Sequence, residues 1–199
     1  MAKKLNTGIT GERTTVALTD EQYKALVQLI RDGTPNKRIR PNHRVAMALV
    51  LEANLGIRVS DIVRLRLSDI LLDGENYRLN ITEQKTGKRR EFFVDPRLVF
   101  YLQSYCIDHG IDRDERIIAI TTRQVQRVLH NAAEYLGYER ISTHSFRKFF
   151  ATKAYESSNY NLVLVQSLLQ HSSAAVTQRY VHASSKEMLE ALENITEIV

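Results

Sequence analysis

Residues 45–55 constrain the fold most, because the segment VAMALVLEANL is apolar on nearly every side of a helix. A surface helix carries one apolar stripe, whereas a helix that is apolar all round needs neighbours on every side. The sequence therefore predicts a buried central helix with other elements packed around it. With 199 residues and 43% hydrophobic content, the chain is long enough to build one such core as a single compact domain.

Helical apolar spacing also precedes this central segment. Thr19 and Gln22 form a capping box, and the amphipathic helix that follows is expected to end at Gly33. Residues 1–15 are polar and show no apolar period, so we expect a flexible lead-in there. The folded domain should begin at residue 16.

Further helices are predicted after the central segment. Gly56 can turn the chain, and Ser60 with Asp61 is expected to cap a short helix. Apolar spacing and helix stop signals then indicate a helix over residues 96–110, a helix that Thr122 caps and Gly137 ends, a helix carrying His144, and a helix carrying Leu162 and Leu169.

Residues 77–94 change to a period of two, which is typical of strands. Two alternating segments, YRLNITE and EFFV, are separated by the glycine-containing turn QKTGKRR. This pattern predicts a β-hairpin with a cationic tip made of Lys85, Lys88, Arg89 and Arg90. The expected fold class is mixed α+β and mainly helical, with a small antiparallel β-hairpin or sheet on one edge.

Charge and composition narrow the class of partner. The net charge is +5 and the pI is near 9.3, which favours an anionic partner such as nucleic acid. The single cysteine, Cys106, excludes an internal disulfide and fits a reducing compartment. The sequence has no apolar run of membrane-spanning length and no apolar signal core at its start. We therefore expect a cytoplasmic protein with no membrane partner.

The residues that carry chemistry concentrate in residues 143–182. His144 and Arg147 are three apart, so on a helix they share a face; His171 and Tyr180 follow. An arginine matches phosphate oxygens, and a histidine can take the proton of a tyrosine hydroxyl. The set suits attack on a phosphodiester by Tyr180. Taken singly, the tyrosine also fits a half-buried aromatic, and the histidines fit ordinary surface groups.

Arg58 and Lys85 can extend this set. Arg58 lies in the turn between two helices, where it is placed to act as a second phosphate clamp with Asp61 to orient it. Lys85 lies at the end of the first hairpin arm, from which an ammonium group can protonate a leaving oxygen. A surface ion pair and a solvated turn are the structural alternatives for the two residues.

Together these motifs resemble the catalytic domain of the tyrosine recombinase (phage integrase) family. The resemblance covers residues 16–185 and rests on five segments in family order: LGIRVSDIVRLRLSDI, QKTGKRR, HSFRKFF, LLQHSS and TQRY. The matching positions are Arg58 for the first catalytic arginine, Lys85 for the hairpin lysine, His144 and Arg147 for the H-x-x-R pair, His171 for the position that is His or Trp in the family, and Tyr180 for the nucleophile. Asp61 departs from the family pattern, which more often has Glu there.

The resemblance implies a site-specific DNA recombinase, or integrase, that needs no cofactor and no metal. The tyrosine would attack a DNA phosphate to give a 3′-phosphotyrosyl bond and a free 5′-hydroxyl, with the arginines and the second histidine stabilising the transition state. The first histidine would act as the base and the lysine as the acid. Two alternatives remain: a type IB topoisomerase, which shares this residue set, and a DNA-binding regulator that has lost catalysis.

The resemblance also implies partners. The substrate would be double-stranded DNA, and residues 186–199 resemble the family's final helix, which packs in trans on a neighbour. Such packing implies a homo-oligomer, from dimer to tetramer on DNA, and leaves room for an accessory DNA-bending protein. Most integrases carry a core-binding domain before the catalytic one. With only about 15 residues preceding the motifs, the chain is expected to be a minimal recombinase or a catalytic fragment.

Overall fold

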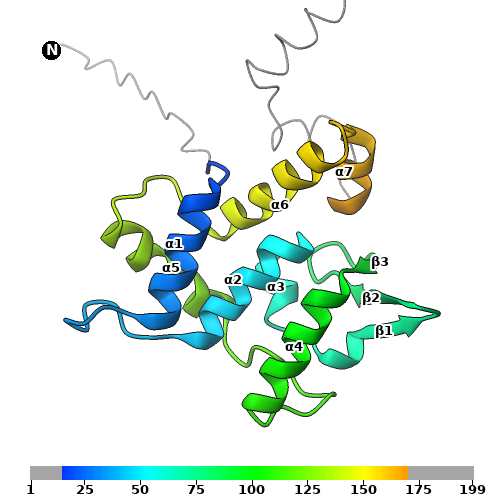
Figure 1. Ribbon diagram of the computed structural model, residues 1–199, viewed down its shortest axis with the longest axis horizontal. Helices are drawn as coiled ribbons and strands as arrows, with labels where there is room; N and C mark the ends of the chain where they lie inside the picture. The colour runs from blue at the N-terminus through cyan, green and yellow to red at the C-terminus, as the bar shows by residue number, and fades with distance from the viewer. Residues whose placement is uncertain (1–14, 170–199) are drawn as a thin grey trace, which may run out of the picture.

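The computed structural model describes residues 15–169 of the chain. Within this range the protein is mainly helical, with a three-stranded antiparallel sheet at one edge, which confirms the predicted fold class (Figure 1). The elements are α1 Asp20–Asp32, α2 His43–Leu55, α3 Val59–Ile62, the 3-10 turn η1 Leu67–Asp69, β1 Ile70–Asp73, β2 Asn76–Thr82, β3 Arg89–Val94, α4 Pro96–Asp108, α5 Thr122–Tyr135, α6 Thr143–Ser157 and α7 Leu162–Leu169.

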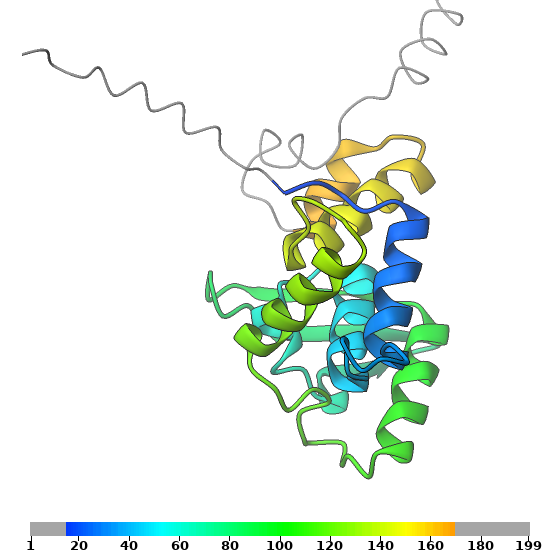
Figure 2. The ribbon, with the colours of Figure 1, turned by 90° about the vertical axis from the view of Figure 1, so that its left-hand side faces the viewer.

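Helix α2 lies at the centre and packs against α1, α3, α5 and α6 (Figures 1 and 2). Nine of its 13 residues are buried, which confirms the all-round burial predicted for residues 45–55. Gly56 ends the helix in the left-handed conformation, with φ 58° and ψ 16°. A Cβ at this position would lie 2.2 Å from the ring of Phe150, so the backbone conformation and the close approach of α6 both require glycine.

The caps of α1 and α5 show how far local sequence determines helix starts. The capping box of α1 is confirmed, since Thr19 Oγ1 accepts from the Gln22 amide at 3.2 Å and Gln22 Oε1 accepts from the Thr19 amide at 3.1 Å. The prediction that Thr122 caps α5 is wrong by one residue. Thr121 is the cap, because Gln124 lies three residues after it and completes the reciprocal pair.

The prediction that Ser60 and Asp61 cap a helix is also wrong. Helix α3 begins at Val59 with Arg58 as its N-cap residue, and no side chain bonds to its first amides. Asp61 is buried inside this single turn, and its Oδ1 accepts from the backbone amide of Gln84 at 2.9 Å. The Asp61 carboxylate therefore binds Gln84, 23 residues further along the chain, instead of capping its own helix.

The sheet has the strand order β1-β2-β3, and β2 with β3 forms the predicted hairpin. Strand β1 was not predicted, since it has four residues, too few to show alternation, and three of them are exposed. Arg90 belongs to β3 opposite Ile81 and is only 1% exposed. The prediction that it lies on the cationic tip is therefore wrong, whereas Lys85 and Lys88 are exposed there.

Helices α6 and α7 lie beside each other at one end of the molecule (Figure 1). Phe146 and Phe149 of α6 are buried in the main core, as expected, and the Phe149 ring stacks on Tyr23 with centroids 4.9 Å apart. Val165 and Leu169 of α7 pack on Ala151 in a smaller cluster. Among residues 15–169, no helix is both long and apolar enough to cross a bilayer.

Candidate active site

Helix α6 presents His144 and Arg147 in its first two turns, where the Ser142 amide donates to Ser145 Oγ at 3.1 Å. The two side chains differ in environment: His144 is exposed, whereas Arg147 is only 1% exposed. The guanidinium of Arg147 donates to the carbonyl of Gly56 and, at 2.8 Å, to the carbonyl of Leu169. The arginine therefore lies beneath the surface on which the imidazole sits.

Arg58 lies in the turn between α2 and α3, and its side chain is 19% exposed. Its Nη1 atom lies 2.7 Å from Oε2 of Glu83, whose side chain is 2% exposed. The expectation that Asp61 orients Arg58 is therefore wrong: Glu83 makes the ion pair, and Asp61 is engaged with the backbone of Gln84. A buried carboxylate at this distance fixes the guanidinium more firmly than an exposed pair would.

Lys85 lies in the loop between β2 and β3, two residues beyond Glu83. The loop is held at its base, because the Glu83 amide donates to the Lys88 carbonyl at 2.9 Å and the Gly87 amide donates to the Glu83 carbonyl at 2.8 Å. Thr86 Oγ1 also donates to Glu83 Oε2 at 2.9 Å. The loop that carries Lys85 is thus tied to the carboxylate that holds Arg58.

The pKa of His144 shows that these groups share one electrostatic environment. Partial desolvation lowers this pKa below its usual 6.5, and the positive charges of Arg147, Arg58 and Lys85 lower it further. A histidine with a lowered pKa is neutral at pH 7 and can accept a proton. Three other predicted site residues, Arg58, Lys85 and Arg147, therefore act electrostatically on the His144 imidazole, whose neutral form at pH 7 can accept a proton.

The other two predicted residues, His171 and Tyr180, lie outside the described residues, as do the predicted final helix and most of the lead-in. The described chain ends close to the site nonetheless. Leu169, two residues before His171 in the sequence, is held by Arg147 through its carbonyl. The last described residue, Leu169, is therefore held by one of the candidate site residues.

Sequence reasoning missed Glu83 and Arg90. Glu83 binds Arg58 through one carboxylate oxygen and Arg90 through the other, at 2.7 and 3.1 Å. The strand period contained the signal. Leu79 and Ile81 lie on the core-facing side of the strand, and the next position on that side is Glu83. Counting back from Val94 in the same way reaches Arg90.

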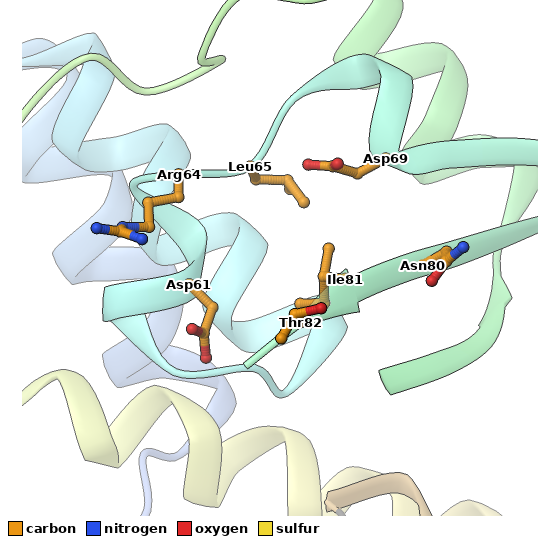
Figure 3. Close-up of a pocket in the computed structure, with 7 residues that line it drawn as sticks. All are labelled: Asp61, Arg64, Leu65, Asp69, Asn80, Ile81 and Thr82. Atoms are coloured by element: carbon orange, nitrogen blue, oxygen red, sulfur yellow. The ribbon is translucent and has the colours of Figure 1, made fainter. Parts of the chain in front are cut away.

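A pocket of about 340 Å³ lies between α3 and β2, and Figure 3 shows its lining. The Asp61 side chain comes from α3, and the Thr82 and Ile81 side chains come from β2. None of the four candidate site residues in the described range lines this pocket. The candidate site is instead a set of side chains around the exposed His144.

The fold and the site together describe a mainly helical domain with an edge hairpin, in which two arginines and a lysine lower the pKa of an exposed histidine. The chain belongs to the phage integrase family, whose model matches residues 16–187. It is 29% identical to the probable integrase/recombinase YoeC of Bacillus subtilis over 149 residues, which cover 72% of this chain and 80% of YoeC. It is 33% identical to the tyrosine recombinase XerC of Corynebacterium glutamicum over 145 residues, which cover 68% of this chain and 46% of XerC.

A solved structure shares the fold. The XerH site-specific recombinase, bound to its difH substrate, superposes with a TM-score of 0.67 at 21% identity, covering 98% of this chain and 58% of XerH. Since the identity is low, the likeness concerns the fold. The chain spans about half the length of several of the curated relatives that it matches, and 80% of YoeC.

Proposed function

We propose that this chain is a site-specific DNA recombinase that cleaves and rejoins strands through a 3′-phosphotyrosyl intermediate. The observation that carries the proposal is the gathering of Arg58, Lys85 and Arg147 around His144 in a member of the phage integrase family. Duplex DNA is the proposed substrate. The net charge of +5 supports an anionic partner, and XerH, which shares the fold, is bound to its difH substrate.

Cleavage begins at Tyr180. Its hydroxyl oxygen attacks the scissile phosphorus and forms a phosphotyrosyl bond to the 3′ side, while His144 takes the hydroxyl proton. The lowered pKa of His144 supports this role, because the imidazole is neutral and ready to accept a proton at pH 7. The bond from phosphorus to the 5′-oxygen breaks, and Lys85 gives that oxygen a proton.

The transition state places extra negative charge on the phosphate. Arg58 and Arg147 stabilise this charge, and His171 donates a further hydrogen bond. The buried carboxylate of Glu83 supports the role of Arg58, because it holds the guanidinium in place before substrate binds. No reorganisation of that cation is then needed when the charge develops.

Rejoining reverses the same steps. A 5′-hydroxyl from another strand gives its proton to Lys85 and attacks the phosphotyrosyl phosphorus, and the leaving tyrosine recovers its proton from His144. Because the phosphoester bond is conserved in the intermediate, resealing needs no ATP. Exchange of partners between two cleaved duplexes gives recombination.

Recombination between two sites requires assembly, for which we propose a dimer that forms a tetramer on DNA, with residues 186–199 docking in trans. Deleting these residues should lower assembly on DNA more than it lowers cleavage of a single site. Sedimentation of the two proteins with a DNA site tests this. An unchanged assembly profile would contradict the docking role. If recombination needs an accessory DNA-bending protein, the purified chain should recombine two sites only when host extract is added.

The experiment that tests the function is the capture of SDS-stable protein–DNA adducts from fragmented genomic DNA, followed by sequencing of the trapped ends. Tyr180→Phe should abolish adducts while leaving DNA binding unchanged. The matched control is Tyr160→Phe, at an exposed tyrosine before α7, which should form adducts like the wild type. Adducts clustered at one inverted repeat establish a site-specific recombinase. Scattered adducts would indicate a topoisomerase, and their absence at low salt would overturn the proposal.

A further inference from the structure

Two buried arginines connect the ends of two helices. Arg90 from β3 and Arg147 from α6 are each 1% exposed. Arg90 Nη2 donates to the Leu168 carbonyl at the end of α7, and lies 3.5 Å from the Leu55 carbonyl at the end of α2. Arg147 makes the corresponding pair of bonds one residue further along each helix, as described above. Two guanidinium groups thus bridge two consecutive carbonyls at the end of α2 and two consecutive carbonyls in α7. We call this pair of side chains the arginine bridge.

The bonds have a physical reason. The last carbonyls of α2 have no partner within the helix and carry its partial negative charge, so these cationic donors stabilise them. The arrangement also has a cost, because burial and the nearby charge of Arg147 lower the pKa of Arg90 to about 10. Glu83, 3.1 Å from Arg90, offsets part of this cost. Apolar side chains would fill the same space without the cost of removing charged groups from water. We therefore infer that the arginine bridge has a role other than filling the core.

The position of the bridge indicates that role. At the α2 end it holds Gly56, two residues before Arg58 in the sequence. At the α7 end it holds Leu169, two residues before His171. Glu83 binds both Arg90 and Arg58, so the end of α7 is connected to the Arg58 guanidinium through two ion pairs.

We propose that Arg90 is a positioning residue for DNA cleavage: with Arg147 it anchors α7 beside the turn that carries Arg58, and through Glu83 it holds the Arg58 guanidinium in place. This inference rests on the proposed function. Arg90 itself touches no substrate. It acts by limiting the movement of α7 and the Arg58 guanidinium relative to each other, which raises the fraction of molecules whose site residues are placed for cleavage.

The test compares Arg90→Met, Arg90→Lys and Leu102→Ala with the wild type. Methionine keeps much of the volume but donates no hydrogen bonds, whereas lysine keeps the charge. Leu102 is a fully buried residue of α4, so its truncation lowers stability without touching the bridge. Rates of adduct formation are measured at saturating DNA, at temperatures where all variants are equally folded, together with DNA affinity and amide hydrogen exchange in α7.

We expect Arg90→Met to cleave at least tenfold more slowly with DNA affinity within threefold of the wild type, and to exchange the α7 amides faster. Arg90→Lys should recover part of the rate. Leu102→Ala should keep both the rate and the α7 protection. A wild-type rate in Arg90→Met, or an equal loss in Leu102→Ala, would overturn the inference. If the wild type forms no adducts, the proposed function fails, and unchanged α7 exchange in Arg90→Met would then overturn the anchoring as well.

Discussion

The Arg58 guanidinium lies 2.7 Å from the Glu83 carboxylate, and this ion pair joins the turn after the central helix to the base of the β2–β3 hairpin. The second oxygen of the same carboxylate lies 3.1 Å from Arg90. Burial alone would raise the pKa of Glu83, but hydrogen bonds from Thr86 and the two arginines hold it below its usual value. One buried anion therefore pairs with two cations and connects the hairpin to the candidate site.

Removal of this anion should destabilise the fold. In Glu83→Ala, Arg90 stays buried without its counter-charge, which we expect to cost about 3–5 kcal/mol of the free energy of unfolding. Urea denaturation at pH 7 measures this. The control is Glu91→Ala on the same hairpin, whose exposed pairs with Arg89 and Arg78 contribute about 0–1 kcal/mol. Equal losses in the two variants would show that Glu83 acts as an ordinary surface carboxylate.

The pH dependence of cleavage should report His144. Because partial desolvation and then the charge of Arg147 lower its pKa, the base form persists as the pH falls to 6.5 and is lost only below that value. Single-turnover adduct formation should thus fall to half of its value at pH 8 only below pH 6.5. The unfolded state has the higher pKa and binds more protons there, so stability should fall over the same range. An inflection above pH 6.5 would contradict this assignment.

An NMR titration of His144 gives an independent measure of the cationic environment. Lys85→Gln removes one of the positive charges that lower the histidine pKa, so the pKa should rise in this variant. Arg113→Gln, in the loop between α4 and α5, removes a charge that is not among those affecting His144 and should leave the pKa unchanged. A pKa of His144 that is the same in wild type and Lys85→Gln would place the lysine away from the imidazole.

The role of Lys85 as an acid can be separated from binding. Lys85→Ala should slow cleavage of an ordinary phosphodiester by about 10²–10⁴-fold, because the leaving oxygen no longer receives a proton. A substrate with sulfur at the 5′-bridging position has a leaving group that needs no acid, and the variant should cleave it at nearly the wild-type rate. Adduct formation on the two substrates measures this. Equal slowing on both would mean that the lysine contributes by binding.

Gly56 should tolerate no side chain. Gly56→Ala combines a left-handed backbone with an overlap between its Cβ and Phe150, which we expect to cost about 2–5 kcal/mol of unfolding free energy. Gly74→Ala is the matched control, since its φ is 63° and no atom lies within 4 Å of the added Cβ. It should cost only about 1–2 kcal/mol. Similar values for the two variants in thermal denaturation would mean that α6 can move away from the turn.

Several features of this protein follow from sequence alone. The buried helix over residues 45–55, the capping box of Thr19 with Gln22 and the hairpin all depend on side chains within a few residues of one another. Periodicity and caps express such local interactions directly. The order of the recombinase motifs likewise sufficed to indicate the family that the comparison with known proteins shows.

Tertiary structure decided which charged groups meet. Glu83 rather than Asp61 pairs with Arg58, across 25 residues of sequence, and Arg90 turns inward to bridge α2 and α7 instead of lying on the hairpin tip. Local spacing cannot choose between such partners, because their energies depend on burial and on the counter-charges that packing brings near. The sequence determined most of the elements and the family, and the packing of α2, the hairpin and α7 determined how the candidate site is held together.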